Sequence, residues 1–438
     1  MGKYDDKLNL VVFEPLRLGI ERPWTLASYR KTGGYEVWQR ILGEKPPRGE
    51  IIDQVKASGL RGRGGAGFPT GTKWSLMPRS SPVQKYVVCN SDESEPGTCH
   101  DRDILRFNPH ALIEGMAIGG YAMNATVAYN YIRGEFLGEP VPRFEAALQE
   151  AYDAGLLGRN IKGSGIDFDL YTFVGAGAYI CGEETALLDS LEGKPGKPRF
   201  KPPFPAAFGL YGAPTTINNT QTFASVPTIL RKGPQWFASL GAPNSGGTII
   251  FSVSGHVSRP GHWELPLGIP FADLLELAGG VWKGRKLKAV IPGGSSTPVV
   301  PAEIMMKTNM DYDSVRAVGS GLGTAAVVVM DDSTCMVSAL ARLSRFYMAE
   351  SCGQCTPCRE GTGWLYRMLK RILGGEGTRG DLDLLLDVAG RIEGHTICAF
   401  GDAAAWPVQS FLKHFRHEFE YMVDHGGRSI VDDRRQAA

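Results

Sequence analysis

The sequence lacks the features that direct a chain into a membrane, onto nucleic acid or out of the cell. Its formal net charge is only +1 over 438 residues, so neither nucleic acid nor an anionic lipid surface is expected as the main partner. The N-terminal stretch Met1–Lys7 is polar and has no apolar signal core. The most apolar stretch, Ala111–Ala128, contains Glu114 and three glycines, which predicts a core helix and strand rather than a membrane span. We expect a cytoplasmic protein with no direct membrane insertion.

The sequence also lacks the residue arrangements that are typical of hydrolases. The eight histidines are scattered, and no Ser-His-Asp or Cys-His arrangement stands out. Four of the eight cysteines, Cys89, Cys99, Cys181 and Cys335, have no metal-like spacing. Three of these are expected to be inert buried thiols, and Cys99 lies in a polar loop.

The remaining four cysteines form a strong motif. Cys352, Cys355 and Cys358 follow one another at three-residue steps, and Cys398 lies forty residues further on. A C-x2-C-x2-C run with a fourth cysteine is typical of a [4Fe–4S] cluster. Zinc sites favour two separated C-x2-C pairs or mixed Cys/His sets, and disulfides need an oxidising compartment that nothing here indicates. Zinc and disulfides therefore stay as the weaker interpretations.

Two glycine-rich loops occupy positions suited to ligands. The first, Arg61–Lys73, has five glycines and three cations in thirteen residues, which indicates phosphate binding by Arg61, Arg63 and Lys73. A helix precedes this loop, so it is not a standard Rossmann turn, which requires a strand there. The second loop, Gly175–Thr185, follows a predicted strand. The polar run Asn90–Gly97 also follows a strand, and the carboxyl ends of strands are where α/β sheets bind ligands.

The order of elements predicts a multidomain fold with α/β, α+β and all-α parts. Strands and helices alternate up to about residue 230, which favours a largely parallel, Rossmann-like sheet. Strand, strand, helix and strand follow, and then four helices that carry the cysteines. The expected segments are an irregular lead-in with one short helix, an α/β domain, a small α+β domain, a helical domain and a loose tail, at residues 1–45, 46–240, 245–330, 333–422 and 423–438 respectively.

Three segments together resemble one known family. Arg61–Gly71, Gly175–Glu184 and Glu350–Arg359 resemble the NADH-binding flavoprotein subunit of respiratory complex I, NADH:quinone oxidoreductase, and the resemblance extends from about Trp24 to Tyr421. It implies FMN, an NADH site and one [4Fe–4S] cluster. It also implies a ubiquitin-like (soluble-ligand-binding-type β-grasp) middle domain and a helical cluster domain.

The resemblance also implies a set of site residues. The expected flavin contacts are Gly62, Gly64, Lys73, Asn90, Asp92, Gly182, Glu183, Asn218 and Asn219. The expected nucleotide contacts are Gly65, Phe68, Glu95, Tyr179, Glu184, Lys201 and Phe204, with Glu95 positioning the nicotinamide. Departures from the family pattern are Leu76 in place of an aromatic, Asp189 in place of Asn, and Cys99.

The expected reaction is hydride transfer from NADH to FMN followed by single-electron transfer to the cluster and on toward quinone, with no side chain assigned as acid or base. The family implies a thioredoxin-like [2Fe–2S] subunit and a large multi-cluster iron–sulfur subunit as partners in a hetero-oligomeric complex on the cytoplasmic side of the inner membrane. The same module also occurs as the diaphorase subunit of soluble NAD-linked hydrogenases and formate dehydrogenases. Two further interpretations are a scaffold without nucleotide binding and a structural zinc module.

Overall fold

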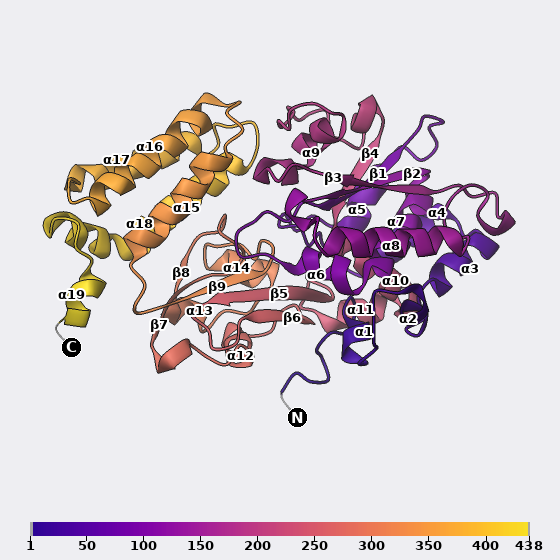
Figure 1. Cartoon of the computed structure of the whole chain (residues 1–438), viewed down its shortest axis with the longest axis horizontal. Helices are drawn as coiled ribbons and strands as arrows, with labels where there is room; N and C mark the ends of the chain where they lie inside the picture. Colours follow the sequence, from indigo (N-terminus) through magenta and orange to yellow (C-terminus); the bar gives the residue numbers. More distant parts are fainter. Residues whose placement is uncertain (1–2, 437–438) are drawn as a thin grey trace. The chain divides into compact units, whose positions relative to one another are not determined.

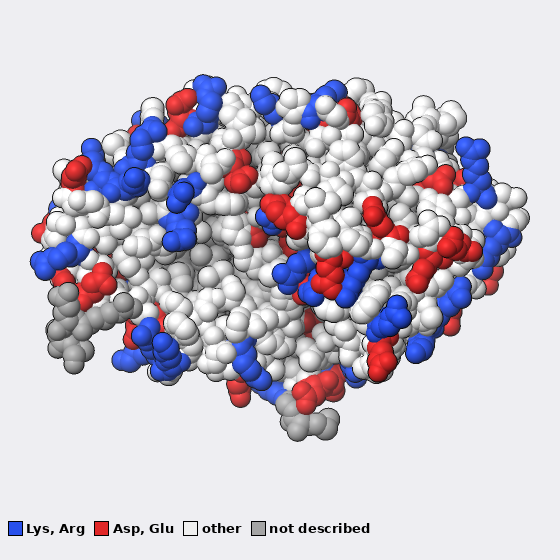
Figure 2. Space-filling model, viewed as in Figure 1, with Lys and Arg blue, Asp and Glu red and all other residues white. Residues whose placement is uncertain are grey.

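A computed structural model describes residues 3–436 and divides into two compact units. Unit 1 comprises residues up to Ser94, Thr98–Phe251 and His262–Ile269, and unit 2 comprises Glu95–Gly97, Ser252–Gly261 and residues from Pro270. Figure 1 shows the element order along the chain. Within residues 3–436 no helix combines the length and the apolar character that a membrane crossing needs. Figure 2 shows acidic and basic side chains interspersed on one face, as the near-zero net charge leads one to expect.

Unit 1 is built on a parallel sheet with the strand order β3-β2-β1-β4. Every pairing in it is parallel, which confirms the α/β expectation. The strands are β1 (Tyr86–Ser91), β2 (Val127–Ile132), β3 (Asp169–Val174) and β4 (Thr215–Asn219). The helices in chain order are α1 (Glu14–Arg17), α2 (Leu26–Arg30), α3 (Glu36–Glu44), α4 (Arg48–Ala57), α5 (Thr70–Ser75), α6 (His100–Phe107), α7 (Pro109–Met123), α8 (Pro140–Asp153), α9 (Glu184–Leu191), α10 (Thr220–Lys232) and α11 (Pro234–Leu240).

Helix α7 is the central element of this core. All fifteen of its residues are buried, which confirms that the apolar stretch of the sequence is a core helix. It packs so closely on α10 that a Cβ added at Gly115 would lie 2.0 Å from the Phe223 carbonyl oxygen. Its one carboxylate, Glu114, accepts hydrogen bonds from the Tyr29 hydroxyl at 2.6 Å and the Tyr35 amide at 2.9 Å. The charge that argued against a membrane span therefore binds the N-terminal segment to the core.

The lead-in differs from the expectation of one short helix. The structure has three helices there, and the nine-residue α3 buries Val37, Trp38, Ile41 and Leu42. Trp38 is fully buried, and its indole donates a hydrogen bond to the Leu156 carbonyl at 2.8 Å. The segment is therefore part of the unit 1 core, because its apolar side chains are covered by residues far away in the sequence.

Unit 2 contains most of a second sheet and the C-terminal helices. The sheet has the order β6-β5-β9-β7-β8, with β5 (Thr248–Gly255) parallel to β9 (Ala326–Asp331) and β7 (Leu287–Ile291) antiparallel to β8 (Val300–Pro301) and β9. The remaining strand is β6 (Gly261–Pro266), and the helices are α12 (Phe271–Leu277), α13 (Ala302–Met305), α14 (Tyr312–Ala317), α15 (Met336–Glu350), α16 (Thr356–Leu373), α17 (Arg379–Ile392), α18 (Phe400–Asp424) and α19 (Ile430–Gln436). The expectation of a loose tail is wrong for α19, in which Val431 is buried; residues 437 and 438 lie outside the described chain.

Candidate functional site

The first glycine-rich loop lies between α4 and α5. The Gly62 amide donates to the Phe68 carbonyl at 2.8 Å, which closes the loop on itself. Gly65 and Gly67 have φ of 113° and 63°, a region that favours glycine. A Cβ added at Gly64 would lie 2.9 Å from Asn219 Cβ, so this glycine allows the loop to approach the end of β4 closely. Two residues that the resemblance assigns to the flavin are therefore neighbours.

The structure corrects the expected role of two arginines in this loop. Arg63 is fully buried, and its guanidinium donates to the carbonyls of Thr248 at 3.1 Å and Gly246 at 2.8 Å. Arg61 donates through Nε to the Gly67 carbonyl at 2.7 Å. Both side chains hold backbone carbonyls, so they brace the loop instead of presenting charge to a phosphate. Of the three cations, Lys73 is the one whose ammonium group pairs with the second loop.

Polar residues at the carboxyl ends of β1 and β4 lie side by side, and one of them contacts the second glycine-rich loop. Asn90 donates to the Gly182 carbonyl at 2.8 Å and lies beside Asn219 in the strand register. Asn218 is buried and accepts a hydrogen bond from the Trp74 indole at 2.9 Å. Because β1 and β4 are adjacent parallel strands, their carboxyl ends share one edge of the sheet. This edge brings the two loops together.

Two lysines and two glutamates face one another at the start of α9. Lys73 lies 2.9 Å from Glu184, and Lys201 lies 2.9 Å from Glu183 and 3.3 Å from Glu184. Burial raises the pKa of Glu184, but the two lysines outweigh it and hold the pKa below its usual value. Glu183 also accepts from the Thr185 and Ala186 amides at 2.9 Å, so it caps α9.

Two of the three aromatic residues assigned to the nucleotide are exposed. Phe68 is 49% exposed and Phe204 is 59% exposed, while Tyr179, in the 3-10 turn before Glu183, is half-buried. Leu76, the departure from the family pattern, is 59% exposed. Exposed phenyl rings are costly to leave in water and can stack on a flat heterocycle. These positions suit an aromatic ligand.

The three carboxylates after β1 do not act together. Asp92 accepts from the Ser94 hydroxyl at 2.9 Å, and Glu93 accepts from the Asp101 amide at 2.7 Å. Glu95 belongs to unit 2, where it accepts from the Ser296 amide at 2.7 Å and the Ser295 hydroxyl at 3.0 Å. Because the three carboxylates lie within four consecutive positions, their spacing in the sequence does not predict that each has different partners.

The cysteine motif spans the turn between α15 and α16 and the start of α18. Cys355 is the N-cap residue of α16, Cys358 lies in the first turn of that helix, and Cys352 precedes both. The Ile397 amide donates to Cys355 Sγ at 3.3 Å, which brings the segment containing Cys398 to the other three. None of the four is in a disulfide within residues 3–436. An amide-to-sulfur hydrogen bond that joins the segment of Cys398 to Cys355 fits a cubane cluster, whose thiolate ligands are tuned by such bonds.

Family models match most of the chain. Residues 55–228 match the Nuo51 FMN-binding domain, residues 250–329 the SLBB domain, and residues 338–422 the NADH-ubiquinone oxidoreductase-F iron–sulfur binding region. The cofactors expected from the sequence, FMN, NADH and a [4Fe–4S] cluster, are confirmed by these matches.

Relatives that match nearly the whole chain indicate the same family as the family models. The F subunit of the NADH-quinone oxidoreductase of Rickettsia bellii (strain OSU 85-389) is 57% identical over 405 residues, 92% of this chain and 96% of the relative. Its counterpart from Rickettsia typhi is 56% identical over 429 residues, 98% of this chain and 100% of the relative. A solved NAD+-reducing [NiFe]-hydrogenase in the H2-reduced state has a TM-score of 0.79 and 36% identity over 86% of this chain and 62% of that chain. The chain belongs to the family of F subunits of NADH-quinone oxidoreductase, which carry FMN and a [4Fe–4S] cluster and oxidise NADH.

Proposed function

We propose that this chain oxidises NADH at the sheet edge where its two glycine-rich loops meet. The observation that carries the proposal is the pair of links from Asn90 to Gly182 and from Lys73 to Glu184. These links place glycine backbone, amides and a lysine at the carboxyl ends of parallel strands, where α/β sheets bind phosphorylated ligands. When bound, FMN supplies the conversion of a two-electron hydride into single electrons.

The side chains at this sheet edge bind the ligands and orient them. Lys73 offers a positive charge to a phosphate once it is released from Glu184, and Asn90 and Asn219 offer amides at the sheet edge. Phe68 and Phe204 cover one face of a bound ring and keep water from it. The remaining contacts implied by the resemblance belong to the same proposal: Gly62, Gly64, Gly65, Asp92, Glu95, Tyr179, Gly182, Glu183, Glu184, Lys201 and Asn218.

Cys352, Cys355, Cys358 and Cys398 would hold the [4Fe–4S] cluster as thiolate ligands. When bound, the cluster would supply single-electron chemistry. As proposed domains, residues 46–240 form the FMN and NADH domain, residues 245–330 a β-grasp domain and residues 333–422 the cluster domain. The proposed partners are a thioredoxin-like [2Fe–2S] subunit and a large multi-cluster iron–sulfur subunit, and the proposed location is peripheral, on the cytoplasmic side of the membrane.

A diaphorase role in a soluble hydrogenase is the second candidate. The observation in its favour is the 36% identity to the NAD+-reducing [NiFe]-hydrogenase chain, of which this chain spans 62%. The 57% identity to the Rickettsia bellii relative, over 96% of that protein, is the stronger observation and favours the complex I role.

Anaerobic titration of the purified protein with NADH tests the proposal. NADH should bleach the flavin absorbance and produce the EPR signal of a reduced [4Fe–4S] cluster. The variant Lys73→Ala should lose flavin, whereas Lys194→Ala, which removes an exposed lysine paired with Glu192, should keep it. A wild-type protein that contains flavin but does not respond to NADH would contradict the proposal.

A further inference from the structure

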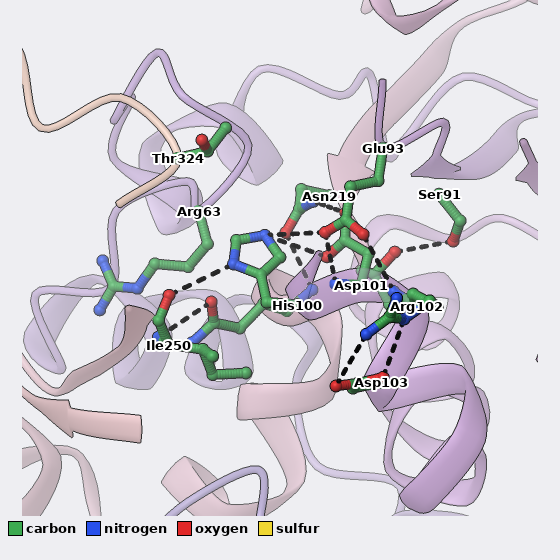
Figure 3. Close-up of polar contacts among 12 residues, drawn as sticks. Arg63, Ser91, Glu93, His100, Asp101, Arg102, Asp103, Asn219, Ile250 and Thr324 are labelled. Atoms are coloured by element: carbon green, nitrogen blue, oxygen red, sulfur yellow. Dashed lines mark hydrogen bonds and ion pairs between the residues drawn. The ribbon is translucent and has the colours of Figure 1, made fainter. Parts of the chain in front are cut away.

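Three side chains outside the proposed flavin and NADH contacts converge inside unit 1. Glu93, His100 and Asp101 are 5%, 0% and 3% exposed. Each offers one atom that can bind a metal, and these atoms all lie within 4.8 Å of one another. Figure 3 shows the imidazole of His100 facing both carboxylates. The three residues come from the loop after β1 and the first turn of α6.

The backbone fixes which nitrogen of His100 is available to bind a ligand. Nδ1 lies 3.4 Å from the Ile250 carbonyl oxygen, an acceptor, so in the neutral imidazole this contact favours the proton on Nδ1. In that tautomer the unprotonated Nε2 lies 3.4 Å from Asp101 Oδ1 and 3.7 Å from Glu93 Oε2. Among residues 3–436, neither His100 Nε2 nor Asp101 Oδ1 has a hydrogen-bond partner. Nε2 and the two carboxylate oxygens therefore lie close together without a hydrogen bond from Nε2 to either carboxylate.

Within the described part of the chain, the side-chain and backbone donors to the two carboxylates are neutral. Glu93 accepts from the amides of Asp101 and Arg102, and Asp101 Oδ2 accepts from the Asn219 amide at 2.6 Å. The guanidinium of Arg63 holds backbone carbonyls, and that of Arg102 pairs with Asp103. Burial raises the pKa of Glu93 and of Asp101 to about 8 each, which is the expected effect on two buried acids that lack a paired cation.

We propose that Glu93, His100 and Asp101 bind a divalent first-row metal ion, with zinc the best fit, through three protein ligands and one further coordination position. Zinc bonded to nitrogen and oxygen at about 2.0–2.1 Å in tetrahedral geometry places its ligand atoms about 3.3–3.4 Å apart. The observed separations of 3.4 and 3.7 Å are close to this spacing. Two carboxylates and one divalent ion also leave the buried cluster without net charge.

A proton in place of the metal fits the geometry less well. An imidazolium would aim its N–H at one carboxylate oxygen at about 2.7–2.9 Å. His100 Nε2 instead stands between two oxygens at longer distances, and its Nδ1 contact with a backbone carbonyl is the usual outer contact of a metal-binding histidine.

The site would join three segments of unit 1. Glu93 follows β1, His100 and Asp101 begin α6, and Asp101 holds Asn219 at the end of β4. A bound ion would therefore fix the amide of Asn219 at the sheet edge where the flavin is proposed to bind. The ion itself does not depend on that proposal, because none of its three ligands is an assigned flavin or nucleotide contact.

Elemental analysis of the purified holoprotein tests the proposal directly. We expect about one zinc per chain in addition to the cluster iron, since three buried side chains offer ligand atoms at a common point. His100→Gln and Asp101→Asn should lose the zinc and retain the iron. His262→Gln is the matched control, because it removes a neighbouring imidazole that pairs with Asp103 and should keep the zinc. Anomalous diffraction at the zinc edge should place the ion among the three ligands.

The wild-type protein alone can overturn the proposal. Protein isolated without chelators that contains no zinc, manganese, cobalt or nickel, and takes up none in equilibrium dialysis, has no metal site here. The variant His100→Lys gives a second check, because an ammonium group supplies charge but does not act as the metal ligand. If that variant keeps the stability and the flavin content of the wild type, and the wild type contains no metal, then Glu93, His100 and Asp101 share a proton instead of binding an ion. A protein that contains zinc but binds no flavin would contradict only the proposed function.

Discussion

Lys73 and Glu184 are ion-paired at 2.9 Å between Nζ and Oε2, which joins the helix after the first glycine-rich loop to the helix after the second. Lys201 contacts the same carboxylate at 3.3 Å. One carboxylate therefore faces two cations in a partly buried position. The two cations reduce the effective negative charge that Glu184 presents to a ligand. They therefore reduce the expected preference for NADH over NADPH.

Glu184→Gln should weaken the preference for NADH over NADPH. A carboxylate at the adenosine ribose repels a 2′-phosphate, costing about 2–3 kcal/mol here because two lysines offset part of it. We expect a roughly 30- to 200-fold preference in kcat/KM for NADH in the wild type. The variant should reduce this preference, chiefly by raising kcat/KM for NADPH, as measured by steady-state kinetics with ferricyanide as the electron acceptor. Asp53→Asn, in the exposed pair with Lys56, should leave the ratio unchanged. Equal use of both cofactors by the wild type would exclude Glu184 as the discriminating residue.

Cys398→Ala should remove the cluster and spare the flavin. The fourth thiolate is needed to hold a cubane, whereas the flavin contacts are proposed in unit 1. Iron and labile sulfide should fall, the EPR signal should vanish, and NADH-to-ferricyanide activity should largely remain. Cys335→Ala removes a cysteine outside the motif and serves as the control. An unchanged EPR signal in Cys398→Ala would show that the fourth ligand is a different residue.

Asp331→Asn should destabilise unit 2 near neutral pH. Asp331 is fully buried; burial raises its pKa, but hydrogen bonds from Ser333 and Trp282 outweigh this and lower it to about 2. A carboxylate with a folded pKa below its unfolded value adds stability above about pH 4, and that stability is lost as pH falls toward 2. The loss at pH 7 should be about 2 kcal/mol.

Denaturant unfolding at several pH values measures this effect. The difference between wild type and Asp331→Asn should be largest near neutral pH and should narrow below pH 4. Asp332→Asn, at the exposed neighbouring position, should have little effect at any pH. A difference that stays constant from pH 7 to pH 3 would assign the loss to packing rather than to charge.

Cys89 should resist alkylation in the folded protein. It is fully buried, and burial raises the pKa of its thiol to about 12. At pH 8 only roughly one thiol in ten thousand would be ionised, and the thiolate is the reactive form. Mass spectrometry after brief iodoacetamide treatment should find Cys89 unmodified and the partly exposed Cys335 modified. Equal rates at both positions would mean that the β1 strand opens readily.

Local sequence patterns determined the elements that carry the site. The strands expected before the second glycine-rich loop and at the polar run Asn90–Gly97 are present as β3 and β1. The cysteine motif was equally clear, because ligand spacing on one segment is a local property. The family resemblance added the cofactors, which the comparisons confirm; the individual flavin and nucleotide contacts remain predictions.

Only the tertiary structure determined which partners the polar side chains contact. Arg63 looked like a phosphate ligand in its glycine-rich loop, yet two of its acceptors are carbonyls more than 180 residues away. Glu93 looked like a loop charge and no pattern singled out His100 or Asp101, but the sheet and α6 bury all three together. Helix α3 was missed because its stability depends on contacts with distant residues such as Leu156. Sequence periodicity reports how a segment folds locally, whereas the burial and the partners of a charge depend on chain segments that no local pattern contains.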